Sequence, residues 1–207
     1  MVGREAAAVA TAVLSLPLRW LGNGEHLDPA ASDAPPVVFV HGLFGDPTNF
    51  LVLRRSLGGG RHVTSFAYAP GFEYERKAAD LRRLIERVCE VTGARKVDIV
   101  GHSLGGLVAR HLVATDGGHL VRRFVTLGAP YYPRPLAANE LAIYGADDLL
   151  VAPHPRAAQT GRVRVVPDCG HLGLLYHPVV ADEVAAYLGQ SASSAEPALT
   201  VVMREAA

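Results

Sequence analysis

Short, continuously apolar runs that alternate with helix-like segments restrict the fold of this chain more than any other feature. A strand with one solvent-exposed face alternates apolar and polar residues, whereas an unbroken apolar run is typical of a strand buried on both faces. The pattern therefore predicts an α/β domain with a mostly parallel sheet of about six strands and helices on both faces. The expected strands are Val37–Val40, His62–Tyr68, Lys96–Val100, Val121–Thr126, Leu141–Tyr144 and Val163–Val166.

The segments between these runs carry helical patterns. Tyr74–Thr92 places its apolar residues three and four positions apart and is followed by Gly93, a residue type that commonly ends a helix. Leu104–Ala114 and Pro178–Leu188 are expected to form two further helices, the second of which opens with a proline, as the first position of a helix allows.

We expect one folded domain. The 207 residues fit a single core, and we assign residues 35–189 to it, after a leader at residues 1–34 and before a loosely ordered tail at residues 190–207 that is rich in serine and alanine. The leader contains an apolar stretch, Ala6–Leu18, that fits either a packed helix or a weak signal-like segment. The stretch is short for a membrane span, which favours a cytoplasmic or membrane-peripheral protein, with secretion as the alternative.

Charge and cysteine content argue against several functions. The chain has 20 basic and 20 acidic residues and a formal net charge of zero, so no net field exists to hold the phosphates of a nucleic acid. Its two cysteines, Cys89 and Cys169, give neither a zinc-ligand cluster nor a disulfide framework. We therefore expect no nucleic-acid partner and no metal site.

The turn between the third strand and the next helix carries a candidate nucleophile. Lys96–Val100 runs into the letters GHSLG at residues 101–105 and then into an apolar helix, which is the strand, turn and helix that a Gly-x-Ser-x-Gly elbow requires. Gly101 and Gly105 would remove side chains that collide with the neighbouring strand and helix. The elbow would expose the Ser103 hydroxyl at the carboxyl ends of the strands, where open α/β folds place ligands. A serine that only caps the helix is the competing interpretation.

The end of the first strand is the expected place for an oxyanion hole. Val37–Val40 is followed by His41, Gly42 and Leu43, and hydrolases with such an elbow recruit one backbone donor there and the other from the residue after the nucleophile. We assign the two donors to the N–H groups of Leu43 and Leu104. His41 is expected to brace the loop by hydrogen bonding rather than to act in catalysis.

A serine hydroxyl needs a base to take its proton and an acid to orient that base. In hydrolases with such an elbow, both residues follow the serine along the chain. The strand Leu141–Tyr144 breaks into a turn with two candidate acids, Asp147 and Asp148. His171 follows the last strand in a loop before the last helix, which is the expected place for the base.

Other histidines fit the position of the base less well. His154 and His177 lie beside prolines and lack the context of a strand followed by glycine and histidine. His102 is adjacent to Ser103 and is expected to point away from it.

Three ordered motifs carry a resemblance to a known family. Residues 91–106 (VTGARKVDIVGHSLGG), 125–130 (VTLGAP) and 170–176 (GHLGLLY) resemble the small, lidless bacterial lipases of the α/β-hydrolase superfamily. The resemblance covers about residues 35–188. It implies a minimal α/β-hydrolase fold and triacylglycerol lipase or carboxylesterase activity.

The same resemblance implies a triad of Ser103, Asp148 and His171, in which Asp148 is preferred to Asp147 because the spacing Asp-x-x-Val matches the acid loop of these lipases. Residues 131–140 are too few to hold a helical lid, so no lid domain is expected. The chain departs from the family in its leader and in the Tyr-Tyr-Pro letters at residues 131–133, which leaves the choice of ester open.

These expectations combine into two-step acyl transfer through an acyl-enzyme on Ser103, without cofactor or metal. The expected partner is a small-molecule ester or a lipid, with peripheral contact to lipid surfaces and no obligatory protein partner. An acyltransferase or an amidase could use the same triad. A hydrolase-like binding module without catalysis is the non-enzymatic alternative.

Overall fold

The computed structural model of the chain describes residues 34–57, 61–132, 136–152 and 162–190. The expected leader and tail lie outside these residues, apart from the residues at their inner ends. Among the described residues, no helix is long and apolar enough to cross a membrane.

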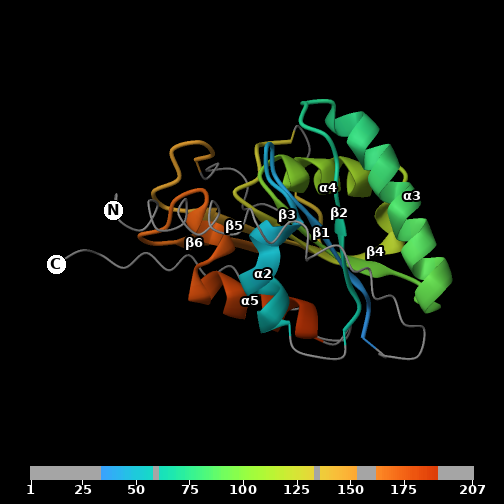
Figure 1. Cartoon of the computed structure of the whole chain (residues 1–207). Coiled ribbons are helices and arrows are strands. Elements are labelled where there is room, and N and C mark those ends of the chain that lie inside the picture. Colours follow the sequence, from blue (N-terminus) through green and yellow to red (C-terminus); the bar gives the residue numbers. More distant parts are fainter. Residues whose placement is uncertain (1–33, 58–60, 133–135, 153–161, 191–207) are drawn as a thin grey trace.

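One six-stranded sheet forms the centre of the molecule, in the order β2-β1-β3-β4-β5-β6. Every neighbouring pair of strands runs parallel, as the apolar runs predict (Figure 1). The strands are β1 (Val37–Val40), β2 (Val63–Phe66), β3 (Val97–His102), β4 (Val121–Leu127), β5 (Glu140–Gly145) and β6 (Arg162–Val166).

Helices cover both faces of the sheet, as expected. α3 (Tyr74–Thr92) and α4 (Leu104–Ala114) pack on one face, and α2 (Leu51–Ser56) and α5 (Pro178–Gly189) pack on the other (Figure 1). α3 ends at Gly93, whose φ of 70° is the left-handed conformation that glycine adopts without steric cost. The expected bounds of α3 and α4 are confirmed, and α5 runs one residue further.

Strand β1 shows how one apolar run serves two cores. Val37 and Phe39 contribute to the core under α2 and α5, whereas Val38 and Val40 contribute to the core under α3 and α4. All four side chains are fully buried, because successive side chains of a strand point to opposite faces. Burial of one such side chain stabilises the fold by about 1.5–3 kcal/mol, so a polar residue at any of these positions would be costly.

Five strands differ from their expected bounds: β3, β4 and β6 by one or two residues at an end, and β2 and β5 for identifiable reasons. β2 is shorter than His62–Tyr68 because its partner β1 offers only four residues for pairing. β5 begins at Glu140, one residue before the expected start. A charged residue is not expected in a buried strand, but this carboxylate is buried because it pairs with Arg110. α2 and the 3-10 helices η2 (Pro47–Phe50), η3 (Gly118–Leu120) and η5 (Gly173–Leu175) were not expected.

The carboxyl ends of the central strands meet at one edge. In the sheet register Val40 pairs with Gly101, and His102 pairs with Leu127. The loops that follow β1, β3 and β4 therefore begin side by side. Between β4 and β5, none of the described residues 128–132 and 136–139 is helical, which agrees with the expectation of no lid.

Candidate active site

Ser103 occupies a strained turn between β3 and α4. Its φ of 53° and ψ of −122° lie outside the regions that residues with a side chain prefer, and strain of this kind costs about 1–3 kcal/mol. The backbone N–H of Ser103 donates to the carbonyl of Leu127 at 2.8 Å, which fixes the turn against the end of β4. The sequence-predicted elbow is present in this geometry.

The elbow glycines are places where the backbone comes too close for any side chain. A Cβ at Gly105 would lie 2.1 Å from the carbonyl oxygen of Val40, and one at Gly101 would lie 2.7 Å from the carbonyl oxygen of Gly105. Both clashes are with main chain, which cannot move without shifting β1 or α4. Glycine at these positions lets the strand, the helix and the neighbouring strand meet around Ser103.

Asp148 and His171 form a buried pair. His171 Nδ1 and Asp148 Oδ2 are 2.7 Å apart, and both side chains are nearly inaccessible to solvent. The other carboxylate oxygen, Oδ1, accepts hydrogen bonds from the N–H groups of Leu150 and Val151, each at 2.8 Å. Burial alone would raise the pKa of Asp148, but the hydrogen bonds from His171 and from these N–H groups, with the charge of His171, hold its pKa below the ordinary value. The Asp148 carboxylate therefore stays ionised and fixes the proton of His171 on Nδ1.

Gly128 brings the serine and this pair together. It follows Leu127, whose carbonyl holds Ser103, and it adopts a φ of 53°. A Cβ at Gly128 would lie 3.0 Å from His171 Nδ1 and 3.1 Å from Asp148 Oδ2. The end of β4 is thus in contact with the elbow around Ser103 on one side and with His171 and Asp148 on the other.

The loop after β1 lies against the elbow. A Cβ at Gly42 would lie 3.0 Å from the Cβ of Ser103. Leu43 is the next residue, and Leu104 is the first residue of α4, where N–H groups have no acceptor within the helix. The two expected oxyanion donors, the N–H groups of Leu43 and Leu104, therefore belong to two main-chain segments that lie next to Ser103.

His41 is bound into this loop rather than directed at chemistry. Its Nδ1 lies 2.8 Å from the carbonyl oxygen of Gly42, its Nε2 accepts from the N–H of Tyr68 at 3.4 Å, and its ring stacks on the Tyr68 ring with centroids 4.2 Å apart. The Tyr68 hydroxyl also donates to the His41 carbonyl. These contacts match the expected bracing role.

Backbone strain marks the same three loops. Among the described residues, the non-glycine residues with positive φ are Phe44, Ser103 and Asp168. They lie in the loop after β1, in the elbow and in the loop that carries His171. Strained backbone persists where the surrounding structure over-determines it, and it concentrates at functional sites.

The weaker candidates lie elsewhere. Asp147 donates its N–H to the carbonyl of Cys169 at 3.0 Å and is only half-buried. His177 caps α5, where its Nδ1 accepts from the N–H of Val179, and His154 lies outside the described residues. His102 is buried with its ring centroid 4.7 Å from that of His171, a contact that sequence reasoning missed.

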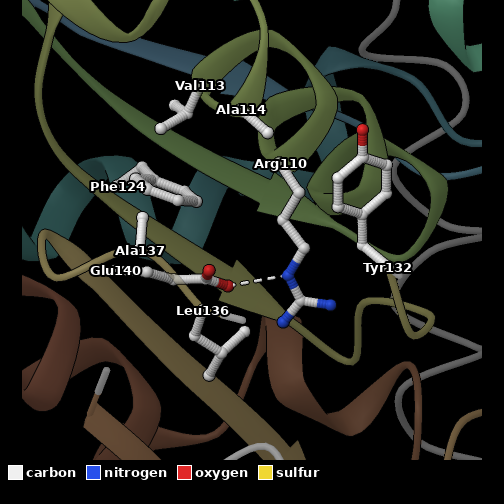
Figure 2. A pocket seen from close by; sticks show the side chains of 8 residues that line it. All are labelled: Arg110, Val113, Ala114, Phe124, Tyr132, Leu136, Ala137 and Glu140. Carbon is white, nitrogen blue, oxygen red and sulfur yellow. Dashed lines mark hydrogen bonds and ion pairs between the residues drawn. The ribbon is translucent and has the colours of Figure 1, made fainter. Parts of the chain in front are cut away.

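Arg110 forms a second buried network, which sequence reasoning also missed. Its Nε donates to Glu140 Oε1 at 2.8 Å (Figure 2). Nη1 donates to the carbonyls of Ala129 and Pro130, and Nη2 donates to Thr126 Oγ1 and the Tyr144 hydroxyl. All five donors of the guanidinium are thereby used, so Arg110 ties α4 to β4, β5 and the loop after Gly128.

Beside this network lies a cavity of about 230 Å³. Its walls are mostly apolar, with Phe124 and Leu136 among them, and its polar lining comes from Arg110, Tyr132 and Glu140 (Figure 2). None of the three triad candidates lines it. In the described part of the chain, no group of three or more metal-binding side chains occurs.

The doubly covered parallel sheet and the strained serine elbow define the α/β-hydrolase class. Residues 35–142, more than half of the chain, match the sequence profile of the alpha/beta hydrolase fold family. The chain belongs to this family.

The chain is similar to several curated enzymes over part of its length. An sn-1-specific diacylglycerol lipase of Danio rerio is 32% identical over 105 residues, which are 46% of this chain and 32% of the relative. A triacylglycerol lipase of Vibrio cholerae is 35% identical over 99 residues, 45% and 31% of the two chains. An ethanol acetyltransferase of Cyberlindnera jadinii is 28% identical over 102 residues, 44% and 29% of the two chains. The chain thus spans about a third of the length of the curated relatives it matches.

Solved structures share the fold. A thermophilic esterase from Thermogutta terrifontis superimposes with a TM-score of 0.59 at 17% identity, over 76% of this chain and 90% of the esterase. The carboxylesterase CesB from Bacillus subtilis gives a TM-score of 0.58 at 13% identity, over 76% and 84% of the two chains.

Proposed function

We propose that the protein is a serine hydrolase that cleaves carboxylic esters through an acyl-enzyme on Ser103. The observation that carries the proposal is the meeting, around Gly128, of a strained serine elbow with a buried histidine-aspartate pair. The similarity to lipases supports ester hydrolysis. Hydrolysis of p-nitrophenyl esters from acetyl to palmitoyl tests the activity and reports the preferred chain length. If the protein hydrolyses none of these esters, the proposal is wrong.

The candidate residues divide the steps of the reaction between them. His171 Nε2 takes the proton of the Ser103 hydroxyl as its oxygen attacks the ester carbonyl, and Asp148 stabilises the imidazolium that results. The N–H groups of Leu43 and Leu104 bind the oxyanion. His171 then gives its proton to the leaving alcohol, and a water molecule activated by the same histidine releases the carboxylic acid and restores Ser103.

The two aspartates of the acid turn give a matched test. Asp148→Asn removes the charge that holds the Nδ1 proton of His171, and we expect kcat to fall by about 10²–10⁴-fold. Asp147→Asn changes a neighbouring carboxylate that does not contact His171, and its kcat should stay close to that of the wild type. Steady-state hydrolysis of p-nitrophenyl butyrate measures both. A larger loss in the Asp147 variant would reverse the assignment.

An apolar rim surrounds the carboxyl edge of the sheet and supports an ester with an acyl chain as the substrate. Its five members are large apolar side chains in loops that follow strands, each 62% exposed or more. The other exposed large apolar residues in the described part of the chain are valines on α3, β6 and α5. The rim comprises Phe44, Phe72, Tyr131, Leu149 and Leu150.

The rim would allow the enzyme to adsorb to a lipid surface while it binds its substrate. Its five side chains project from four loops, and insertion of such side chains into an apolar phase is favourable in proportion to the area buried. Because the formal net charge is zero, adsorption should not require anionic lipid and should vary little with salt.

The prediction for this surface uses a double variant outside the catalytic groups. Leu149→Ser with Phe72→Ser should lower binding to phosphatidylcholine vesicles by about tenfold or more, since each side chain contributes on the order of 1.5 kcal/mol when it leaves water. Hydrolysis of soluble p-nitrophenyl acetate should be unchanged. Val91→Ser, an exposed apolar residue on α3, is the control and should bind as the wild type does. Equal binding by all three proteins would contradict a lipid-facing rim.

Acyl transfer to an alcohol is the second candidate function, and the similarity to ethanol acetyltransferases is the observation that favours it. The same acyl-enzyme would react with ethanol in place of water. Hydrolysis of p-nitrophenyl acetate in increasing ethanol separates the two: a transferase forms ethyl acetate at the expense of acetate at ethanol concentrations far below that of water. Release of acetate alone would leave hydrolysis as the activity.

A further inference from the structure

His102 is a buried histidine that the proposed reaction does not use. It is the last residue of β3 and precedes Ser103 directly. Its Nε2 lies 3.1 Å from the carbonyl oxygen of His171, and the two imidazole rings are in contact. One side chain of the strand that carries the nucleophile therefore reaches the main chain of the residue proposed as the base.

The partner of His102 fixes its tautomer. A backbone carbonyl can only accept, so His102 Nε2 carries the proton and donates it, and Nδ1 is without a proton in the neutral ring. Nδ1 faces the loop after β1, where a Cβ at Gly42 would lie 3.1 Å from it. The ring thus fills the space between the expected oxyanion loop and the loop that carries His171.

The loop around His171 is held by main-chain bonds. Before His171, the carbonyl of Cys169 accepts from the N–H of Asp147 at 3.0 Å, and a second bond spans His171, from the N–H of Leu174 to the carbonyl of Gly170 at 3.3 Å. His171 itself is held by two side chains. Asp148 binds its ring, and His102 binds its carbonyl.

We propose that His102 is a positioning residue, which holds the backbone of His171, and through it the imidazole, at a fixed place relative to Ser103. The proposal rests on the proposed ester hydrolysis for its kinetic consequence. Proton transfer between the serine and the histidine depends on a donor-acceptor distance near 3 Å, and a displacement of about 1 Å can cost about 10²-fold in rate. The bond from Asp148 restrains one ring nitrogen of His171, and the bond from His102 restrains the main chain that carries the ring.

A neutral donor suits this position. The ionisable groups around His102 are His171, Asp148 and His41, and burial, followed by the charge of a protonated His171, lowers the pKa of His102 to about 3. His102 is therefore uncharged at the pH at which an ester hydrolase works. A permanently charged donor such as lysine would repel the imidazolium that forms on His171 during acyl transfer, whereas the neutral ring holds the loop without opposing that charge.

The kinetic test compares two linear side chains of similar size. The His102→Gln amide can donate from the place of Nε2, and His102→Met cannot donate. We expect His102→Met to lower kcat for p-nitrophenyl butyrate by about 10–100-fold with KM changed by less than about threefold, and His102→Gln to recover most of the loss. If His102→Met does not fold, His102→Asn takes its place, because its shorter amide cannot reach the His171 carbonyl. Equal kcat in the Gln and the donor-free variants would overturn the proposal.

A second measurement does not depend on catalysis. In protein labelled with ¹⁵N-histidine, His102 should give the signals of the neutral Nε2–H tautomer and should not titrate between pH 8 and about pH 4, since its pKa is about 3. In the unaltered protein, an Nδ1–H tautomer would refute the hydrogen bond to His171. An inactive wild type with the Nε2–H tautomer present would refute the ester hydrolysis while leaving the contact intact. The two failures are therefore distinguishable.

Discussion

Replacement of Ser103 by alanine is expected to lower kcat for ester hydrolysis by about 10⁴-fold or more, because no acyl-enzyme can form without the hydroxyl. The residual rate would come from the oxyanion donors and substrate binding alone. Steady-state and single-turnover assays with p-nitrophenyl butyrate measure the loss, and the thermal unfolding midpoint reports whether the fold is retained.

A second serine provides the control for this variant. Ser65 lies in β2, and its buried hydroxyl has no hydrogen-bond partner among the residues that the structure describes. Ser65→Ala should keep the full activity, since it removes a hydroxyl that contacts neither the elbow nor the acid and base. A Ser103→Ala protein that is folded and as active as Ser65→Ala would exclude Ser103 as the nucleophile.

The largest effect on stability is expected at Arg110. Arg110→Met would leave the Glu140 carboxylate unpaired in an apolar interior and would remove the donor of two backbone carbonyls. Loss of one partner of a buried ion pair typically costs about 3–5 kcal/mol, and urea unfolding of the variant should show a loss of this size in the free energy of unfolding.

The partner substitution separates the ion pair from the rest of the network. Adding Glu140→Leu to Arg110→Met removes the unpaired charge and should restore part of the stability, but not all of it, because Thr126, Tyr144 and the two carbonyls still lack their donor. Arg83→Met is the control, since its ion pair with Asp80 is on the surface and should contribute little. An equal effect of Arg83→Met and Arg110→Met would contradict this account.

The regular elements could be predicted closely from the sequence because their signals are local. The apolar runs and the helical spacing of Tyr74–Thr92 needed no knowledge of distant residues, and all six expected strands and three expected helices occur in the structure. The short helix α2 has few residues with which to show a periodic pattern, and it is stabilised by packing against α5 through Leu53. Its existence depends on residues more than a hundred positions away.

The candidate site also has a part that the local sequence predicts and a part that depends on distant residues. The elbow around Ser103 is encoded in adjacent residues, and its strand and helix context is visible in the sequence. The pairing of His171 with Asp148 rather than Asp147 followed from a family resemblance, and the hydrogen bond in the structure agrees with that preference. The contacts of His102 and Arg110 could not be predicted, because they join segments brought together only by the register of the sheet.

A fluorophosphonate probe tests the central proposal most directly. Such a probe phosphonylates a serine only where an oriented base activates it. We predict that the native protein gains the mass of one phosphonyl group, that the adduct maps to the peptide containing Ser103, and that unfolding in urea before labelling abolishes it. Absence of an adduct on the native protein, or an adduct on another residue, would contradict the assignment of Ser103 as the nucleophile.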